Sequence, residues 1–253
     1  MRPILFQIGR MPILSYGFSL AIAFIVCTLL GMKEATRKDI DPGKIVDLAL
    51  YLCVSGIIGA RLFFILLDIP TYFNNPVQIF NIRDGGLTYH GGFIVALLVG
   101  IAFAHRSKIN AWVMADIIAP LIALGYSIVR VGCLLNGCCY GLPANIPWAL
   151  PCRAGDLTLR HPTQIYASVL SLVIFIVLYA KRDHKKFPGY LMFLYVGLYS
   201  VSRFIVEIFR DSPRLIGPFS VAQLASALFI FGAFTSIYIL SANSAGEQSP
   251  AQQ

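Results

Sequence analysis

The chain has 253 residues, of which 57% are hydrophobic and only 13% are charged. A soluble domain carries about twice that share of charged residues, so the composition excludes a typical cytosolic enzyme, a secreted disulfide scaffold and a disordered chain. It indicates a protein that crosses a membrane several times. The formal net charge of +8 is expected to reflect basic loops facing anionic lipid, with no nucleic acid as a partner.

A membrane-spanning helix needs about 20 mainly apolar residues. Seven windows meet this requirement and predict an all-α, polytopic integral membrane protein with seven transmembrane helices: 12–31, 46–67, 90–105, 112–135, 164–181, 189–209 and 219–240. The third window is short and begins at His90-Gly-Gly92, so an irregular or re-entrant start is expected there. We predict one membrane domain over 1–240, with 136–163 as a loop outside the membrane, and a disordered polar tail over 241–253.

Lysine and arginine are unevenly distributed over the loops between these windows. Ten lie in the loops after the first, third and fifth windows, and seven lie at the N-terminus and in the loops of the opposite side. Because cytoplasmic loops carry the excess of basic residues, we expect the N-terminus outside and the C-terminus in the cytoplasm. The long loops 68–89 and 136–163 then both face the outside, where the chemistry is expected.

Five ionisable residues lie within or at the edge of the predicted spans: Arg61, Asp116, Arg130, Arg203 and Glu207. An ionisable group at helix depth costs about 2.5–3.5 kcal/mol on insertion scales and usually faces a polar cavity. For Arg61 and Asp116, structural pairing or snorkelling to the interface is an open alternative. Arg203 and Glu207 are spaced i,i+4, which permits an ion pair on one helix face. The planar donor fork of arginine suits phosphate, which favours an anionic lipid head group as the ligand.

Two glycine-marked polar segments accompany these arginines: Asp84-Gly-Gly-Leu-Thr-Tyr-His-Gly-Gly92 and Arg130-Val-Gly-Cys-Leu-Leu-Asn-Gly-Cys-Cys-Tyr-Gly141. Paired glycines let the backbone approach a ligand or turn sharply, although small residues also serve close helix packing in membranes. His90 is a candidate general base near neutral pH. A histidine at the membrane interface is the alternative interpretation.

These segments resemble the bacterial phosphatidylglycerol–prolipoprotein diacylglyceryl transferase family, over nearly the whole chain and in the same order. The motifs that carry the resemblance are Tyr16-Gly17, Gly59-Ala-Arg61, the segment from Asp84 to Gly92, Asp116-Ile-Ile-Ala-Pro-Leu121, Arg130-Val-Gly132 with Asn136-Gly137, His161-Pro-Thr-Gln-Ile-Tyr166, and Arg203-Phe-Ile-Val-Glu-Ile-Phe-Arg210 with Gln223 beyond. Any one motif would be weak, but seven in order indicate common ancestry.

The resemblance implies a seven-helix enzyme of the bacterial inner membrane. It implies transfer of the diacylglyceryl group of phosphatidylglycerol to the thiol of a lipobox cysteine in a prolipoprotein, with release of glycerol phosphate and with no metal or organic cofactor. Carried over by position, Arg130 and Arg203 would hold the lipid phosphate and His90 would be the base. The other residues of the implied site are Tyr16, Asn136, Glu207, Arg61, Gly91 and Gly92.

The sequence departs from the family within its signature. Family enzymes typically carry Gly-Arg-x-Gly-Asn-x-x-Asn-Gly-Glu-x-x-Gly, whereas here Cys133 takes the place of the first asparagine and Cys138 that of the glutamate. Ala167 takes the place of a glutamate that usually follows the His-Pro-x-Gln-x-Tyr motif. A cysteine can partly replace a carboxylate only as a thiolate, which needs a cation nearby such as Arg130. On this basis Cys138 is included among the candidate catalytic residues.

Cys133, Cys138, Cys139 and Cys152 leave further interpretations open. Together with His161 they could bind zinc or another thiophilic metal, but the C-x4-C-C spacing is not a standard ligand pattern, and we assign no metal ligand. A disulfide is possible in an oxidising compartment. Inert packing and a redox-active thiol relay are the remaining alternatives.

The function predicted from the sequence is therefore diacylglyceryl transfer to a prolipoprotein cysteine. Two alternatives stay open. One is a divergent relative that transfers a lipid-derived group to another thiol or hydroxyl acceptor. The other is a non-catalytic membrane protein that binds anionic lipid or a metal through the same cavity.

Overall fold

Seven long helices form the framework of this computed structural model, which describes residues 2–9, 11–74, 76–80, 85–153, 156–210 and 212–247. Within that part of the chain, seven helices are long and apolar enough to cross a membrane. They are α1 (Ser15–Thr36), α2 (Pro42–Leu67), α4 (Tyr89–Arg106), α5 (Ala111–Asn136), α6 (Thr163–Ala180), α7 (Tyr190–Ile208) and α8 (Val221–Glu247). The predicted all-α membrane fold is confirmed.

Short elements that the apolar windows do not predict connect these helices. A short helix α3 (Ile69–Asn74) and a 3-10 turn η1 (Pro76–Phe80) follow α2. Three antiparallel two-stranded hairpins are also present: β1 (Ile4–Ile8) with β2 (Met11–Leu14), β3 (Leu150–Arg153) with β4 (Asp156–Arg160), and β5 (Arg214–Ile216) with β6 (Phe219–Ser220). Strands this short give too few residues for a recognisable alternating pattern.

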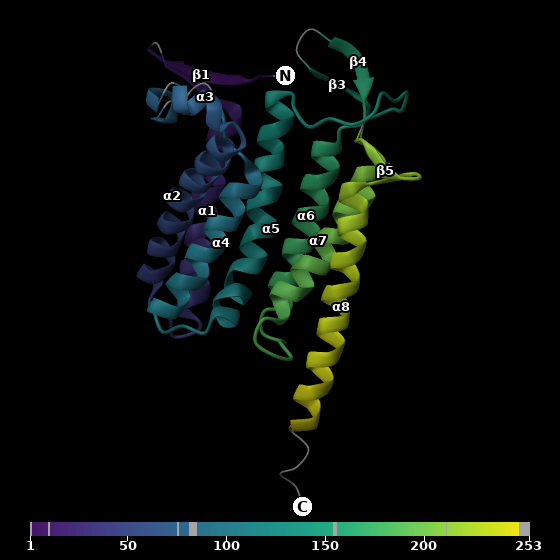
Figure 1. The fold of residues 1–253 in the computed structure, drawn as a ribbon. Coiled ribbons are helices and arrows are strands. Elements are labelled where there is room, and N and C mark those ends of the chain that lie inside the picture. The colour runs from purple at the N-terminus through teal and green to yellow at the C-terminus, as the bar shows by residue number, and fades with distance from the viewer. Residues whose placement is uncertain are drawn as a thin grey trace, which may run out of the picture. The chain divides into compact units, whose positions relative to one another are not determined.

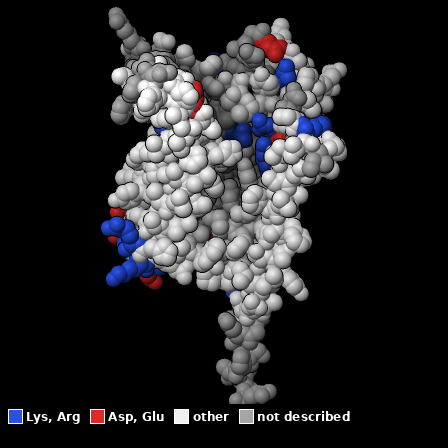
Figure 2. All heavy atoms as spheres, viewed as in Figure 1, with Lys and Arg blue, Asp and Glu red and all other residues white. Residues whose placement is uncertain are grey.

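Several of the helices leave much of their apolar surface exposed. Only 17% of the apolar window of α2 and 11% of that of α8 are buried inside the protein. On the face drawn in Figure 2, side chains other than Lys, Arg, Asp and Glu cover most of the surface between the helix ends. Large apolar surfaces of this kind are unfavourable in water and stable in hydrocarbon, so they are suited to contact with lipid.

The chain divides into two compact units, and each is described by itself (Figure 1). Unit 1 comprises Met1–Leu30 and Ala115–Gln253, and unit 2 comprises Gly31–Met114. The expected single domain over 1–240 therefore contains an internal division. Helices α1 and α5 each belong partly to both units.

In unit 2, glycines bring α2 and α4 into close contact. A Cβ added to Gly59 would lie 2.5 Å from Val95 Cβ, and one added to Gly91 would lie 2.3 Å from Phe63 Cβ and 2.7 Å from Gly59 O. Small residues allow membrane helices to approach this closely. Helix α4 is regular from Tyr89 onward, so the expected irregular start at His90 is wrong: Gly91 and its neighbour are used for helix packing.

In unit 1, α5, α6 and α7 share an apolar core. It contains Ala119 and Ala123 of α5, Ile174 and Leu178 of α6, and Leu191 and Leu194 of α7, together with Phe187 and Tyr190. Helix α8 packs along α7, and the three hairpins lie at the same end of the unit's helices (Figure 1). The C-terminal ends of α5 and α7 and the N-terminal ends of α1, α6 and α8 therefore meet at that end.

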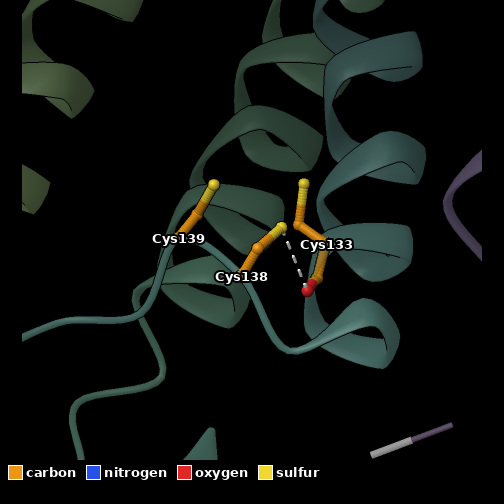
Figure 3. A group of neighbouring side chains, drawn as sticks. All are labelled: Cys133, Cys138 and Cys139. Atoms are coloured by element: carbon orange, nitrogen blue, oxygen red, sulfur yellow. Dashed lines mark hydrogen bonds between the residues drawn. The ribbon is translucent and has the colours of Figure 1, made fainter. Parts of the chain in front are cut away.

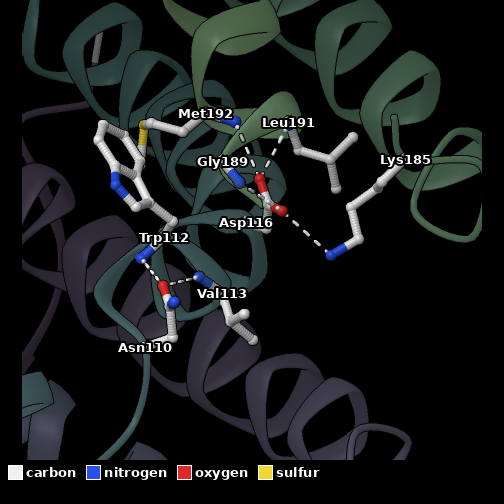
Figure 4. Close-up of polar contacts among 8 residues, drawn as sticks. All are labelled: Asn110, Trp112, Val113, Asp116, Lys185, Gly189, Leu191 and Met192. Atoms are coloured by element: carbon white, nitrogen blue, oxygen red, sulfur yellow. Dashed lines mark hydrogen bonds and ion pairs between the residues drawn. The ribbon is translucent and has the colours of Figure 1, made fainter. Parts of the chain in front are cut away.

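Asp116 links α5 to the start of α7 (Figure 4). Its buried carboxylate accepts hydrogen bonds from the backbone N–H groups of Gly189 at 3.0 Å and Leu191 at 2.9 Å, and it pairs with Lys185 Nζ at 3.0 Å. A carboxylate at this position satisfies N–H groups that a helix N-terminus leaves unpaired. The geometry therefore favours structural pairing, the alternative left open for Asp116, over a role in binding a ligand.

The last helix is longer than the sequence suggests. Helix α8 continues to Glu247, so residues 241–247, which we expected to be disordered, are helical, and 248–253 lie outside the described residues. Alanine favours the helix, and Ser244 Oγ donates a hydrogen bond back to Leu240 O at 2.9 Å, which satisfies the hydroxyl within the helix.

Candidate functional site

The C-terminal end of α5 is closed by a glycine in a left-handed conformation. Gly137 has φ 74°, its N–H donates to Leu134 O at 3.2 Å, and the N–H of Cys138 donates to Cys133 O at 3.1 Å. These two bonds form a Schellman cap, which ends a helix and favours glycine at the turning residue. The cap fixes the direction in which the chain leaves the helix, and it does so between two of the cysteines.

Three cysteine side chains converge immediately after this cap (Figure 3). The sulfur atoms of Cys133, Cys138 and Cys139 all lie within 4.8 Å of one another, and all three thiols point in the same direction. Cys139 has a positive φ of 64°, which is uncommon for a residue with a Cβ. All three are free thiols. Cys152 cannot be placed with them, because its side chain lies outside the described residues.

The His161-Pro-Thr-Gln segment holds the backbone of the two adjacent cysteines. Thr163 Oγ1 donates to Cys139 O at 2.8 Å, and Gln164 Nε2 donates to Cys138 O at 2.7 Å. Both donors are buried at the start of α6. A buried polar group must be hydrogen-bonded, so this motif and the cysteine turn stabilise each other. His161 is not part of the cysteine group. Its Nδ1 lies 3.2 Å from Tyr166 Oη instead.

Arg130 lies one turn before the cysteines on α5. One Nη of its guanidinium group donates to Tyr126 Oη, and the group lies over the Tyr126 ring, 4.6 Å from its centroid. Its Nε is buried and has no hydrogen-bond partner among the described residues. A buried charged donor without a partner is costly, so this atom is free to serve a ligand.

The C-terminal end of α7 carries a second charged group of side chains. Arg203 Nη1 lies 2.9 Å from Glu207 Oε2, and Arg210 Nε lies 3.9 Å from the same oxygen. Ser220 Oγ, at the start of α8, donates to Glu207 Oε1 at 3.1 Å. The predicted i,i+4 pair is therefore present. Beside it lies a cavity of about 250 Å³, lined in part by Glu207, Arg210, Arg214, Ser220 and Gln223.

The two groups of side chains in unit 1 are close enough to influence each other. A hydrogen bond from the Cys133 thiol, together with the positive charges of Arg130 and Arg210, lowers the pKa of Cys139 below its usual value. Burial raises the pKa of Cys138, and a hydrogen bond from Asn136 opposes that change. Cys139 is therefore the member of the group that carries a thiolate most readily.

Tyr16 lies in the first turn of α1, next to this part of α5. A Cβ added to Gly132 would lie 2.7 Å from Ser19 Oγ and 3.4 Å from Tyr16 Cα, so the two helices are in close contact there. Tyr16 is 42% exposed. Unit 1 thus gathers Tyr16, Arg130, Asn136, Cys138, Arg203 and Glu207 at one end of its helices.

The other predicted residues belong to unit 2. Arg61 is buried and donates to the backbone oxygens of Gln78, Ile79, Gly85 and Gly86. It therefore holds the backbone at these four residues, which precede α4 in the sequence.

His90 lies in the first turn of α4. It is exposed, its ring lies 5.8 Å from the Tyr89 ring, and its imidazole makes no hydrogen bond with the residues that the structure describes. Gly91 and Gly92 face α2, where a Cβ on Gly92 would lie 2.8 Å from Gly56 O.

Comparison with known proteins places the chain in a family. The family model described as prolipoprotein diacylglyceryl transferase matches residues 3–239. The chain belongs to the prolipoprotein diacylglyceryl transferase family. It is 34% identical over 236 residues to the phosphatidylglycerol–prolipoprotein diacylglyceryl transferase of Clostridioides difficile (strain 630), covering 93% of this chain and 94% of that protein. The protein of the same name from Geobacter sulfurreducens is 30% identical over 246 residues, covering 94% and 95%.

Several residues of this family member were not singled out by the sequence analysis. Thr163 and Gln164 fix the cysteine turn, and Arg210 and Ser220 share the buried carboxylate of Glu207. Thr163, Gln164 and Arg210 stand inside motifs that carry the family resemblance, which was the available signal. Ser220 had no comparable signal, because only the fold brings the start of α8 to the end of α7.

Proposed function

We propose that this chain transfers the diacylglyceryl group of phosphatidylglycerol to the lipobox cysteine of a prolipoprotein. Family membership over residues 3–239 supports this activity and favours it over transfer to another acceptor or a non-catalytic role. The protein is a multi-pass protein of the inner membrane. We further propose that its N-terminus lies outside, so that the loops 68–89 and 136–163 face the outside as well.

The observation that carries the proposal is the surplus of positive charge at one end of unit 1. Arg203 and Arg210 share a single buried carboxylate, Glu207, and the Nε of Arg130 has no hydrogen-bond partner among the described residues. Guanidinium groups bind phosphate oxygens through a planar set of donors. A phosphodiester carries one negative charge, which this surplus would neutralise.

The reaction requires stabilisation of a leaving phosphate. The sulfur of the lipobox cysteine forms a bond to the glyceryl carbon, the bond from that carbon to the phosphate oxygen breaks, and glycerol phosphate leaves with the electron pair. The thiol proton passes to a base. Fixed donors aimed at the oxygens where charge develops lower the barrier, most effectively where water is scarce.

The remaining residues receive roles within this proposal. Arg130 and Arg203 hold the phosphate, Tyr16 and Asn136 complete the polar surroundings, and Glu207 fixes the direction of Arg203. Cys138 stands where the family has a carboxylate. In unit 2, His90 is the proposed base on the family resemblance. Arg61, Gly91 and Gly92 act indirectly, by holding the segment and the helix that carry His90.

The test is product formation with a defined acceptor. The purified protein in detergent is mixed with phosphatidylglycerol and a lipobox peptide, and mass spectrometry reports whether the peptide cysteine gains a diacylglyceryl group. We expect the mass increase with this protein and a rate about 10²–10³-fold lower with Arg130→Ala, because one donor to the developing charge is lost.

Matched controls make the result specific. Arg182→Ala removes an arginine that interacts with Tyr179, beyond the other end of α6, and should leave the rate near that of the unchanged protein. The Clostridioides difficile relative serves as a positive control for the substrates. An unmodified peptide alongside an active relative would contradict the proposed function, and an unchanged rate in Arg130→Ala would contradict the role of Arg130.

A further inference from the structure

The three converging cysteines have the geometry of a metal site. Zinc bound tetrahedrally to thiolates has Zn–S distances of about 2.3 Å, which place the sulfur atoms about 3.8 Å apart. The sulfur atoms of Cys133, Cys138 and Cys139 all lie within 4.8 Å of one another, so movements of about an ångström or less would bring them to that separation. Three thiolates are soft ligands that select zinc or copper(I) over harder cations.

The backbone is arranged so that two adjacent cysteines can point the same way. In an extended chain, neighbouring side chains point to opposite sides. The left-handed conformation of Cys139 and the left-handed Gly137 before Cys138 change this direction, and the three thiols point together in Figure 3. An unfavourable conformation persists only where its surroundings impose it. Here Thr163 and Gln164 do so, by binding the carbonyl oxygens of both cysteines.

The surrounding charge suits a thiolate-bound cation. Three thiolates and a divalent cation carry one negative charge together, and a fourth thiolate would make it two. Arg130 and Arg210 both act electrostatically on Cys139, so positive charge lies near the group and opposes the negative charge of the bound thiolates. No carboxylate belongs to the cysteine group among the described residues.

We propose that Cys133, Cys138 and Cys139 bind a Zn(II) ion as three thiolates and leave its fourth position open to a thiol from outside the chain. Sites with three protein ligands keep such an open position, and a thiol bound to zinc is deprotonated. The identity of that thiol rests on the proposed function, whose acceptor is a cysteine. On binding, the acceptor thiol passes its proton to the base of the proposed reaction, and a lone pair of its sulfur coordinates the metal. When the sulfur then attacks the glyceryl carbon, the same sulfur forms the new S–C bond and the phosphate leaves with the C–O electron pair.

The first test measures metal binding without any substrate. The full-length protein in detergent, kept reduced with a phosphine, is titrated with Zn(II) against a chromogenic chelator. We expect one equivalent to bind, and we expect that equivalent to be lost in Cys133→Ser, Cys138→Ser and Cys139→Ser. Cys53→Ser, which changes an exposed cysteine of α2, is the matched control and should keep it.

A measurement on the unchanged protein guards against variants that fail to fold. A ligand that binds only the folded state raises the unfolding temperature, so Zn(II) should raise it for the unchanged protein and for Cys53→Ser. No rise, or no stoichiometric binding in the unchanged protein, would overturn the proposed site. Binding of the same stoichiometry in all three serine variants would also overturn it.

The open position is tested with Co(II) in place of Zn(II), because its visible spectrum reports the ligands of the metal. A lipobox peptide should change the spectrum, whereas the same peptide with serine in place of cysteine should not. No change with the cysteine peptide would overturn the open thiol position. Metal binding together with an unmodified peptide in the transfer assay would support the site and contradict the proposed function. If the protein kept its full transfer rate after the metal was stripped, the reaction would not require the metal, and the proposed role of the metal in transfer would be wrong.

Discussion

At the scale of single residues, the buried Arg61 and the partly buried Arg130 differ in how their donors are used. Arg61 donates to four backbone oxygens of its own unit, whereas Arg130 keeps a buried Nε without a partner among the described residues. A guanidinium group saturated by the backbone acts as a structural support. A guanidinium group that keeps an unpaired N–H donor is suited to binding a ligand.

His90 provides a test at the same scale. We expect His90→Ala to lower the transfer rate about 10²–10⁴-fold at neutral pH, because a positioned base contributes that much to proton transfer. The loss should shrink as the pH rises toward the ordinary pKa of a free thiol, near about 8.5, because the acceptor then ionises without help. The measurement is the pH dependence of the rate for both proteins.

His105→Ala is the matched control for this experiment, since His105 is an exposed histidine at the opposite end of α4. Its pH dependence should follow that of the unchanged protein. If His90→Ala retained the full rate at neutral pH, His90 would not be the base.

At the scale of elements, the ends of several helices are held by polar residues that belong to another helix or to the loop beside it. Gly137 ends α5, Thr163 and Gln164 at the start of α6 hold the chain beyond it, and Asp116 of α5 binds the first turn of α7. Such groups cannot rely on water within a membrane, so their hydrogen bonds must come from the protein. The positions of the helix ends therefore depend on a few side chains far away in the sequence.

Asp116 should be required for the stability of α7. Asp116→Ala leaves the N–H groups of Gly189 and Leu191 and the Nζ of Lys185 without their acceptor. We expect a loss of about 1–3 kcal/mol in the free energy of unfolding, the cost of leaving buried donors unsatisfied. Chemical denaturation in detergent measures it.

Asp183→Ala is the comparison for this prediction, because the Asp183 side chain is 58% exposed and lies 3.8 Å from Arg182. An exposed pair contributes less than about 1 kcal/mol, so this variant should unfold close to the unchanged protein. Equal stability of the Asp116 and Asp183 variants would show that the carboxylate of Asp116 does not hold the start of α7.

At the scale of the whole molecule, the part of the chain that the structure describes has seven helices long and apolar enough to cross a bilayer. Within the described residues that number is odd, so a membrane that all seven helices cross would have the start of α1 and the end of α8 on opposite sides. We propose from the basic residues of the loops after α1, α4 and α6 that these loops lie in the cytoplasm. This orientation would place the cysteine turn and the start of α4 on the outer side.

The orientation can be tested with reporter fusions. Alkaline phosphatase is active only outside the cytoplasm, so a fusion after Trp148 should be active and fusions after Lys108 or Lys186 should be inactive. A green fluorescent protein at the C-terminus should fluoresce. The reverse pattern of phosphatase activity would invert the proposed orientation and place the cysteine turn in the cytoplasm.

Much of this protein could be predicted from the sequence, because the responsible signals are local. Each apolar window lies on one observed helix, since hydropathy over about 20 residues decides membrane insertion. The ion pair of Arg203 with Glu207 follows from their i,i+4 spacing. The motifs that placed the chain in its family are likewise short segments read directly from the sequence.

Tertiary structure alone decided how several of these residues are used. Gly91 could have approached a ligand, but contact with Phe63 of another helix makes it a packing residue. Cys138 and Cys139 are adjacent in every conformation, but their thiols point together only because the backbone turns at Gly137 and Cys139 and is held by the start of α6. The sequence determined which residues lie in the membrane. Contacts between distant segments decided which of them have partners and which are left for a ligand, because local spacing carries no information about such contacts.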